Sequence, residues 1–543
     1  MVFARRSTTL LAAIIASCAM VLSLTACTSD NKTVVDGQTT VTSNSAGGVA
    51  VFTPSDGITL NQQTPLNKWA KLVPDLAKAL ADAGFKKGDI DHTTSDSLAK
   101  QSRAIQDFVV DHLSNNTTDD SGIAIAPDNM TLLVAPVVEA DASTRQYGDY
   151  ISQNLSTNDA TDEGATSDGE SSKDDSSKDD SSNTESDSTA SDEQAQAVDR
   201  LVSSLKLAKE SGMHVVLLGN SIEGYKPDAF VKFSDAQTIG KLQAEKMVSK
   251  LKLDKASKDN PKYIEVLLPY TAMDEKGNAN DSTFAQEAFR GIWQVLGSYY
   301  QKGVVESPSG TLDGKSTEND WQAVAYDAAK EGSTAKVLDK RLAKTDGQST
   351  LTRIDGIITM NDYIASEVVK ELDDLGYTGS AADINPQITI SGIVGNITGK
   401  KDLSRDAVPD PIKSPENDNA NDSSSSDDDA DKDTSASDKD RDSQWPLVTG
   451  YGAYVSNIPS IVNGKQWMTG MEDRQTIATD IAQACAKLNK DEALNSMPSI
   501  RNSEVGGVKK IPTISEPLLA VSASNLKSAL IDPGYISLAD AGL

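Results

Sequence analysis

The sequence predicts an α/β fold of two domains built on parallel sheets. Short runs rich in Val, Ile and Leu alternate along the chain with longer amphipathic helical patterns. Such runs are typical of strands in a parallel sheet that helices cover on both faces. Roughly 420 residues stand outside low-complexity segments, which is enough for two domains.

Five strands are expected in order along the chain. They are 122–127 (GIAIAP), 214–218 (HVVLL), 263–268 (YIEVLL), 355–362 (DGIITMND) and 387–394 (QITISGIV). Helical patterns accompany them, among them FAQEAFRGIWQVL after the third strand and YIASEVVKELDDLG after the fourth. This alternation predicts crossover helices between neighbouring parallel strands.

Most of the acidic charge lies in two low-complexity stretches. The formal net charge is −29; residues 156–195 hold 13 Asp/Glu against 2 Lys, and residues 414–444 hold 11 against 3 Lys/Arg. Neither stretch has enough apolar surface to offset the entropy of ordering, so we predict disordered insertions over 154–195 and 412–444. Neither contains an EF-hand loop, so no calcium site is expected in them.

The first residues have the pattern of an export signal. Arg5 and Arg6 precede an apolar run over 10–24, which is shorter than a membrane-spanning helix. The run leads to Leu-Thr-Ala-Cys27, which resembles the bacterial lipobox, where the cysteine is acylated and becomes the first residue. An ordinary signal peptide that ends in cysteine is the alternative. Residues 28–48 are polar and predict a disordered tether, so we expect a protein anchored by lipid to the outer face of the cell membrane.

The remaining cysteines and the histidines argue against a metal site, a cofactor and an enzyme. Cys18 lies in the signal, which leaves Cys485 alone in an apolar helical pattern. His92, His112 and His214 are scattered, and no nucleophile elbow, Walker loop, zincin or dinucleotide-binding motif occurs. Nucleic-acid binding is not expected either, because no basic footprint is present. We therefore expect a protein that is not an enzyme, without catalytic residues and without a cofactor.

Six segments stand in an order that resembles one known family. They are KWAKLVPDLAKALADAGF (68–85), AKESGMHVVLLGNSI (208–222), AFVKFSDAQTIGKLQAEKM (229–247), IDGIITMNDYIASEVVKELDDLG (354–376), IVNGKQWMTGMEDRQTIATDIAQACAKL (461–488) and VKKIPTISEPLLAVSASNLKSALIDPGYIS (508–537). From about residue 60 to the end, the chain resembles the periplasmic sugar-binding proteins of ABC transporters. It is nearest to the xylose-binding and multiple-monosaccharide-binding lipoproteins.

The resemblance implies two Rossmann-like lobes with parallel sheets, joined by three hinge crossovers and closing on a ligand. The implied division is a lipoprotein signal peptide (1–27), a tether (28–48), an N-terminal lobe (49–232 and 395–510) and a C-terminal lobe (233–394 and 511–543). The resemblance further implies a monomer that captures a sugar or polyol and passes it to the permease subunits of an ABC importer.

Residues directly after strands are the candidate ligand-binding residues, because ligands bind at the carboxyl ends of parallel strands. They are Asp128, Asn129, Asn220, Asn361 and Asp362. The resemblance adds Trp69 and Trp321 as stacking faces for a sugar ring, and Lys68 in place of the family's arginine. Packing in the core is the alternative for either tryptophan. Capping of the next helix is the alternative for one member of the Asn361-Asp362 pair.

The charged positions of the family are absent from this chain. Gly219-Asn220 stand where the family has Asp-Arg, Val394 where it has Asp, and Met471-Glu472 where it has Tyr-Lys. Because an acid and a base are lost together, neither charge is left unpaired in the site. We therefore expect a neutral polyol or oligosaccharide and not an anion.

Two other functions are open from the sequence alone. A surface receptor that reports its ligand state to a partner protein has the same fold, and only its partners differ from those of an importer. An interaction protein could have kept the fold with a decayed sugar cleft, which would lack converging polar groups.

Cys27→Ser tests the lipid anchor. We expect the variant to be released into the medium or to stay unprocessed, because it has no thiol to acylate. Cell fractionation and the mass of the mature N-terminus measure this outcome. Normal maturation with retention in the membrane would contradict the assignment.

Overall fold

The computed structural model describes residues 46–56, 65–115, 129–138, 144–156, 184–273, 280–343, 351–381 and 445–543. All of these ranges belong to one compact unit, 45–543. The export signal, Cys27, most of the tether and the greater part of both acidic stretches lie outside the described residues. Within the described ranges, no helix is long and apolar enough to cross a membrane.

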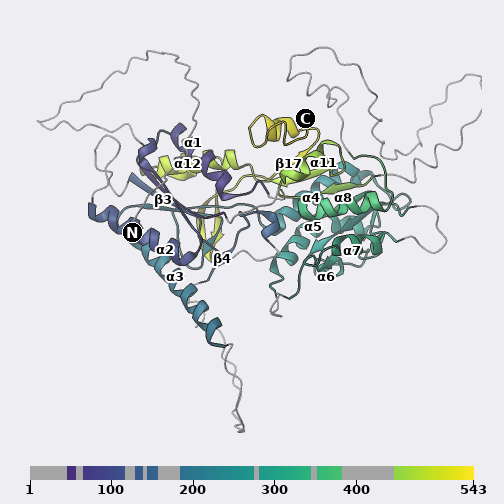
Figure 1. Cartoon of the computed structure of the whole chain (residues 1–543), viewed down its shortest axis with the longest axis horizontal. Helices are drawn as coiled ribbons and strands as arrows, with labels where there is room; N and C mark the ends of the chain where they lie inside the picture. Colours follow the sequence, from purple (N-terminus) through teal and green to yellow (C-terminus); the bar gives the residue numbers. More distant parts are fainter. Residues whose placement is uncertain are drawn as a thin grey trace, which may run out of the picture. The chain divides into compact units, whose positions relative to one another are not determined.

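The larger sheet has seven strands in the order β15-β16-β7-β5-β3-β1-β2, all parallel to their neighbours except β15 to β16. The strands are β1 (Gly48–Pro54), β2 (Ile90–Ser95), β3 (Met130–Val134), β5 (His214–Leu218), β7 (Ala229–Val231), β15 (Ile500–Val505) and β16 (Val508–Ile514). Apolar side chains alternate between its two faces. Helices α1 (Trp69–Asp82) and α12 (Arg474–Leu488) cover one face, and α2 (Leu98–Asn115) and α3 (Thr184–Glu210) cover the other (Figure 1).

The smaller sheet has four parallel strands in the order β10-β8-β12-β13. The strands are β8 (Lys262–Val266), β10 (Val305–Glu306), β12 (Gly356–Ile358) and β13 (Leu447–Thr449). Helices α4 (Ala236–Leu251) and α5 (Thr283–Gln301) pack on one face, and α7 (Ser333–Arg341) and α8 (Asp362–Asp374) pack on the other. The sequence prediction of an α/β fold with two parallel sheets is confirmed.

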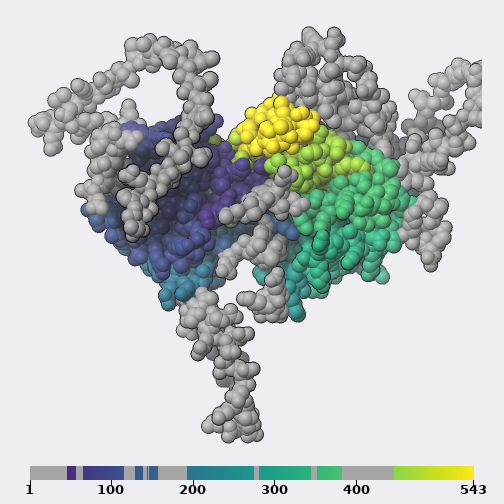
Figure 2. Space-filling view, in the orientation of Figure 1, coloured from purple at the N-terminus to yellow at the C-terminus, as the bar shows by residue number. Residues whose placement is uncertain are grey.

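Short elements complete the described structure. Three strand pairs are β4 (Asn154–Leu155) with β6 (Ser221–Ile222), β9 (Leu268–Pro269) with β11 (Ala325–Tyr326), and β14 (Met468–Met471) with β17 (Leu519–Ser522). The short helices are α6 (Trp321–Val324) and α11 (Ile458–Val462), and a π-helical turn spans Lys527–Ile531. The C-terminal residues, yellow in Figure 2, pack with α11 and β17 in a small separate cluster.

Within the described residues, the chain passes three times between the half of the fold that holds the larger sheet and the half that holds the smaller sheet and the strand pair β14–β17. The passages are residues 232–235 after β7, 472–473 before α12 and 515–518 after β16. This is the number of hinge crossovers that the resemblance implied.

The expected strand positions differ from the structure in one place that matters for the site. The predicted strands 122–127 and 387–394 lie outside the described residues. The strand between β1 and β5 is β3, residues 130–134, which was not among the expected strands. The five residues of β3 are all buried, as a strand covered on both faces requires.

The division into lobes also differs from the prediction. Strand β13 pairs with β12 in the smaller sheet, although 395–510 was assigned to the N-terminal lobe. Strand β16 pairs with β7 in the larger sheet, although its last residues fall in 511–543. Strands that are adjacent in space are far apart in sequence here. The position of a strand along the chain therefore does not reveal the sheet to which it belongs.

The first acidic insertion, predicted over 154–195, has regular structure at both ends. Residues 154–155 form β4, and α3 begins at Thr184. The helix extends back from a buried apolar stripe that includes Val198, Leu201 and Leu205. Propagation from an existing helix needs no new nucleus, which explains why the polar residues before this stripe can be helical.

A buried carboxyl group joins two of the three crossovers. Glu472 accepts a hydrogen bond from the backbone N–H of Ser234 at 2.6 Å and another from the Ser234 hydroxyl. The hydroxyl of Tyr451 lies 2.5 Å from that of Ser234. Burial raises the pKa of Glu472 to about 7, although the hydrogen bonds from Ser234 and Tyr451 act in the opposite direction.

Glu472→Gln tests the energetic cost of this buried acid. A raised pKa means that the folded chain binds more protons than the unfolded chain between the ordinary pKa of 4.5 and about 7. Stability should therefore fall by up to about 3 kcal/mol as the pH rises through this window. We expect the glutamine variant to lack this part of the decline in urea unfolding at pH 5 and pH 8. Glu504→Gln, at an exposed position, is the control and should show the same decline in stability as the unaltered chain. A decline in Glu472→Gln equal to that of the unaltered chain would contradict a raised pKa for Glu472.

Candidate functional site

Several predicted site residues form hydrogen bonds with one segment of the chain, residues 144–156, which we call the arm. The arm lies between β3 and α3 in sequence. Its groups make hydrogen bonds to the side chains of Lys68, Asn220 and Asn361. Asn220 follows the carboxyl end of β5 in the larger sheet, and Asn361 follows that of β12 in the smaller sheet. The structure thus joins each of these three predicted residues to the arm, a segment that the sequence analysis did not single out.

Trp69 is part of the hydrophobic core. It is the first residue of α1 and only 3% exposed. Its ring packs edge-on against Tyr150 and Phe233, with centroids 5.1 and 5.7 Å away. The packing alternative therefore describes Trp69, and its ring has no open face for a sugar.

Lys68 is paired with the arm. Its ammonium lies 2.7 Å from Asp149 Oδ1, and Asp149 Oδ2 accepts a hydrogen bond from the backbone N–H of Trp69. Asp56 lies beside this pair. Burial raises the pKa of Asp56 to about 6, and the charge of Asp149 adds to the effect. The charge of Lys68 is thus shared between two carboxyl groups of the protein.

Asn220 and Asn361 use both ends of their side-chain amides within the protein. Asn220 accepts from the backbone N–H of Gln153 and donates to the carbonyl of Pro136, both at 2.9 Å. Asn361 accepts from the first turn of α8, which it caps, and donates to Gln146 Oε1 at 3.1 Å. The capping alternative therefore describes Asn361.

Asp362 holds three parts of the chain together. Its carboxylate accepts hydrogen bonds from the backbone N–H of Tyr454 at 2.9 Å, the Thr469 hydroxyl at 2.8 Å and the Gln466 amide at 2.7 Å. Burial raises the pKa of Asp362 to about 6, while these hydrogen bonds act to lower it. The side chain is completely buried, so its role in this structure is internal support.

Asn129 lies at the amino end of β3, opposite the carboxyl ends of the strands in the larger sheet. It directly precedes β3 and is exposed, whereas a ligand-binding position would follow the strand. The prediction took Asn129 to follow a strand at 122–127, whereas the described strand beside β1 is β3, which begins after Asn129. Asp128 lies outside the described residues.

Trp321 lines a cavity of about 580 Å³ beside the strand pair β9–β11. The lining residues include Tyr270, Thr271, Trp321, Tyr326, Asp327 and Lys330. The rings of Trp321 and Tyr270 meet edge to face, with centroids 5.1 Å apart. The cavity has a volume in the usual range for small-molecule sites, about 300–1,000 Å³.

Polar groups in this cavity form a short network around Asp327. Its Oδ1 accepts hydrogen bonds from the Thr271 hydroxyl at 3.0 Å and the Ala329 N–H at 3.1 Å. Its Oδ2 lies 3.6 Å from the ammonium of Lys330. Both charged side chains keep some exposure, so they can exchange these partners for a solute.

The sequence analysis missed Tyr270, Tyr326 and Asp327. Tyr270 comes directly after β9, and Tyr326 and Asp327 stand at the end of β11. Tyr270 stands two residues after the expected strand 263–268, so the rule that picks residues directly after strands passed over it. Strand β11 has only two residues and leaves no apolar run in the sequence, so Tyr326 and Asp327 had no such signal.

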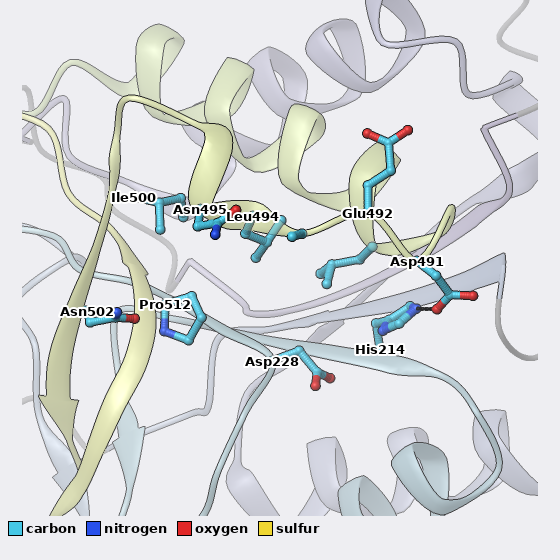
Figure 3. A pocket seen from close by; sticks show the side chains of 11 residues that line it. His214, Asp228, Asp491, Glu492, Leu494, Asn495, Ile500, Asn502 and Pro512 are labelled. Carbon is cyan, nitrogen blue, oxygen red and sulfur yellow. Dashed lines mark ion pairs between the residues drawn. The ribbon is translucent and has the colours of Figure 1, made fainter.

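A second cavity of about 550 Å³ lies at the amino end of β5 (Figure 3). His214 and Asp491 point toward one another there, with Nε2 and Oδ1 4.0 Å apart. Asp228 is paired with Lys209, and Glu492 is paired with Lys487, both at 2.8 Å. Most of its charged groups already have partners, and it lies away from the carboxyl ends of the strands. In the described ranges, no three His, Cys, Asp or Glu side chains gather as a metal site would require.

Trp69→Ala and Trp321→Ala should lower the free energy of unfolding by different amounts, because only Trp69 fills a closed core position. We expect Trp69→Ala to lower the free energy of unfolding by about 3–5 kcal/mol, because it empties a filled core position. Trp321→Ala should cost less, since its ring is 9% exposed against 3% for Trp69 and borders a cavity. Urea unfolding of both variants measures the difference; equal losses would contradict it.

Comparison with known proteins gives structural likeness without likeness of sequence. No protein-family model and no curated protein matches the chain. Among solved structures, it is similar to an ABC transporter solute-binding protein from Clostridium phytofermentans with bound β-D-glucose (16% identity, 91% of this chain and 99% of that chain, TM-score 0.44). It is also similar to a carbohydrate transporter solute-binding protein from Chloroflexus aurantiacus in complex with D-glucose (18%, 92% and 98%, 0.42) and to an arabinose-binding protein from Geobacillus stearothermophilus (10%, 89% and 99%, 0.41). At these identities the likeness concerns the fold and not any bound sugar.

Proposed function

We propose that this chain is a solute-binding protein that captures a neutral, ring-shaped polyol such as a sugar. The observation that carries the proposal is the cavity in which Trp321, Tyr270 and Tyr326 stand around the polar pair Asp327–Lys330. Sugar rings have apolar faces and hydroxyl edges, so they need flat aromatic groups and hydrogen-bonding side chains in the same cavity.

The charges of the cavity favour a solute without a net charge. Asp327 supplies an acceptor and Lys330 a donor, and the two charges balance one another. An anion would face the carboxylate of Asp327, and a cation would face the ammonium of Lys330. Charge-assisted hydrogen bonds to neutral hydroxyls avoid both conflicts.

We further propose that the protein is anchored by lipid at Cys27 and delivers its solute to the permease of an ABC importer. The export signal, the Leu-Thr-Ala-Cys end and the tether support the anchor. The two-sheet architecture with three crossovers suits a protein whose halves move on a ligand. A receptor role would use the same cavity and differ only in its partner protein.

One observation favours a different function, an interaction protein whose sugar cleft has decayed. Asn220, Asn361 and Asp362 have their hydrogen bonds satisfied within the protein. On this alternative, the cavity beside Trp321 binds no sugar, and no sugar changes the stability of the protein.

The test is a thermal-shift screen followed by calorimetry on residues 45–543. D-glucose, D-xylose, L-arabinose, D-allose and myo-inositol are suitable probes. A sugar at a hundred times its dissociation constant should add about 2.7 kcal/mol of stability. Trp321→Ala should weaken binding by about 1–3 kcal/mol, which is roughly fivefold to more than a hundredfold. Trp321→Phe, which keeps a flat ring, is the matched control and should lose less.

Two results would contradict the proposal. The first is a screen in which no sugar or polyol shifts the unfolding temperature. The second is a hit whose affinity is the same for Trp321→Ala as for the unaltered chain, which would place its site elsewhere.

A further inference from the structure

The arm, residues 144–156, makes contacts with the elements of both sheets. In a parallel sheet, one crossover helix is enough to connect β3 to β5. This chain has α3 for that purpose and carries the arm in addition. The connection from β3 to β5 therefore does not require the arm, and the position of the arm must have another cause.

On the side of the larger sheet, the arm is held by several hydrogen bonds. Asp149 pairs with the Lys68 ammonium at 2.7 Å, and its backbone N–H donates to the Asn67 carbonyl at 2.8 Å. The Tyr150 hydroxyl donates to the Lys68 carbonyl at 2.5 Å. Gly148 has a φ of +98°, and a Cβ there would lie 2.5 Å from the Asn67 carbonyl oxygen. Only glycine fits this close approach of two backbones without strain.

On the side of the smaller sheet, two consecutive arm residues make the contacts. The Tyr147 ring is 1% exposed and lies 4.7 Å from the Phe284 ring and 6.2 Å from the Tyr451 ring, measured between centroids. Gln146 Oε1 accepts from the Asn361 amide at 3.1 Å, and the Gln146 carbonyl accepts from the Tyr454 hydroxyl at 2.6 Å.

These two residues have the chemistry of the solute proposed above. Tyr147 presents a flat ring to aromatic neighbours, and Gln146 presents an acceptor to the Asn361 amide, as a sugar hydroxyl would. Tyr147 also belongs to the same buried apolar cluster as Trp321, and Tyr270 packs against that cluster. Burial raises the pKa of the Tyr147 hydroxyl, and the hydroxyl of Tyr326, a cavity residue, raises it further while Asn361 acts in the opposite direction.

We propose that the arm occupies the position beside Asn361, at the carboxyl end of β12: Gln146 and Tyr147 hold the two halves of the chain together without solute, and a solute that extends from the cavity beside Trp321 to Asn361 displaces them. This inference rests on the proposed function for the identity of the solute. We call the contacts of Gln146 and Tyr147 with the smaller-sheet half the strap. The strap can be tested without any solute.

A strap of this kind lowers the apparent affinity of the protein for its solute. Only molecules whose arm has withdrawn can engage solute at Asn361, so the apparent dissociation constant is the intrinsic one divided by the withdrawn fraction. If about one molecule in ten has a withdrawn arm, loss of the strap raises the affinity about tenfold.

The first experiment measures the strap alone. Residues 45–543 with Lys78→Cys on α1 and Lys370→Cys on α8, both exposed positions, carry two spin labels, and Cys485 is buried. Without sugar, the unaltered arm should give one narrow distance between the labels. Tyr147→Ala should broaden the distribution toward longer distances, and Tyr147→Phe, which keeps the ring, should not. An unchanged distribution in Tyr147→Ala would overturn the strap whatever the outcome with sugars.

The second experiment uses the sugar found by the screen. Tyr147→Ala should bind it about tenfold more tightly than the unaltered chain, while Tyr147→Phe should match the unaltered chain. Weaker binding by Tyr147→Ala would make Tyr147 a wall of the site and overturn its role as an occupant. If no sugar binds any variant, the proposed function fails, but the distances between the labels still decide whether the arm is a strap.

Discussion

The buried carboxylate of Asp362 is the interaction on which the arrangement around the site depends. It accepts hydrogen bonds from Tyr454 in the loop after β13 and from Gln466 and Thr469 in and just before β14, so two other segments converge on one side chain. Gly450 is needed for this convergence, because a Cβ there would lie 2.2 Å from Asp362 Oδ1. Burying a carboxyl group is costly unless hydrogen bonds replace water, and here three donors do so. The position of Asp362 fixes the start of α8 and therefore the direction in which Asn361 meets the arm.

The parallel sheets could be predicted because their signal is local. Strands buried on both faces are apolar runs, and the helices between them have a stripe at every third or fourth residue. The arm has no such signal. Its contacts join Gln146 to Asn361 and Tyr147 to Phe284, residues far apart in sequence and with no common pattern. The partition of β13 and β16 between the sheets was missed for the same reason, since pairing over long sequence distances leaves no mark on either strand.

The two tryptophans show where the sequence could have distinguished a core residue from a candidate ligand contact. Trp69 begins a helix whose buried residues are Trp69, Leu72, Leu76 and Leu80, a spacing that places all four on one face. That spacing was sufficient to assign Trp69 to the core. Trp321 begins a helix of only four residues, where no stripe can form, and its ring borders a cavity. A tryptophan outside any periodic pattern is thus the better candidate for a ligand contact in this chain.

The hydrogen bonds of the arm limit the binding free energy that any solute can gain near Asn361. Such a solute cannot gain the full energy of a new hydrogen bond, because the Asn361 amide already has Gln146 as its partner. It gains only the difference between its own contacts and those it replaces, just as folding exchanges bonds to water for bonds within the protein. A solute that leaves the Tyr454 hydroxyl or the Asn361 amide unpaired would lose more than it gains. The arm therefore favours solutes that can satisfy both donors and also fill the space of the Tyr147 ring.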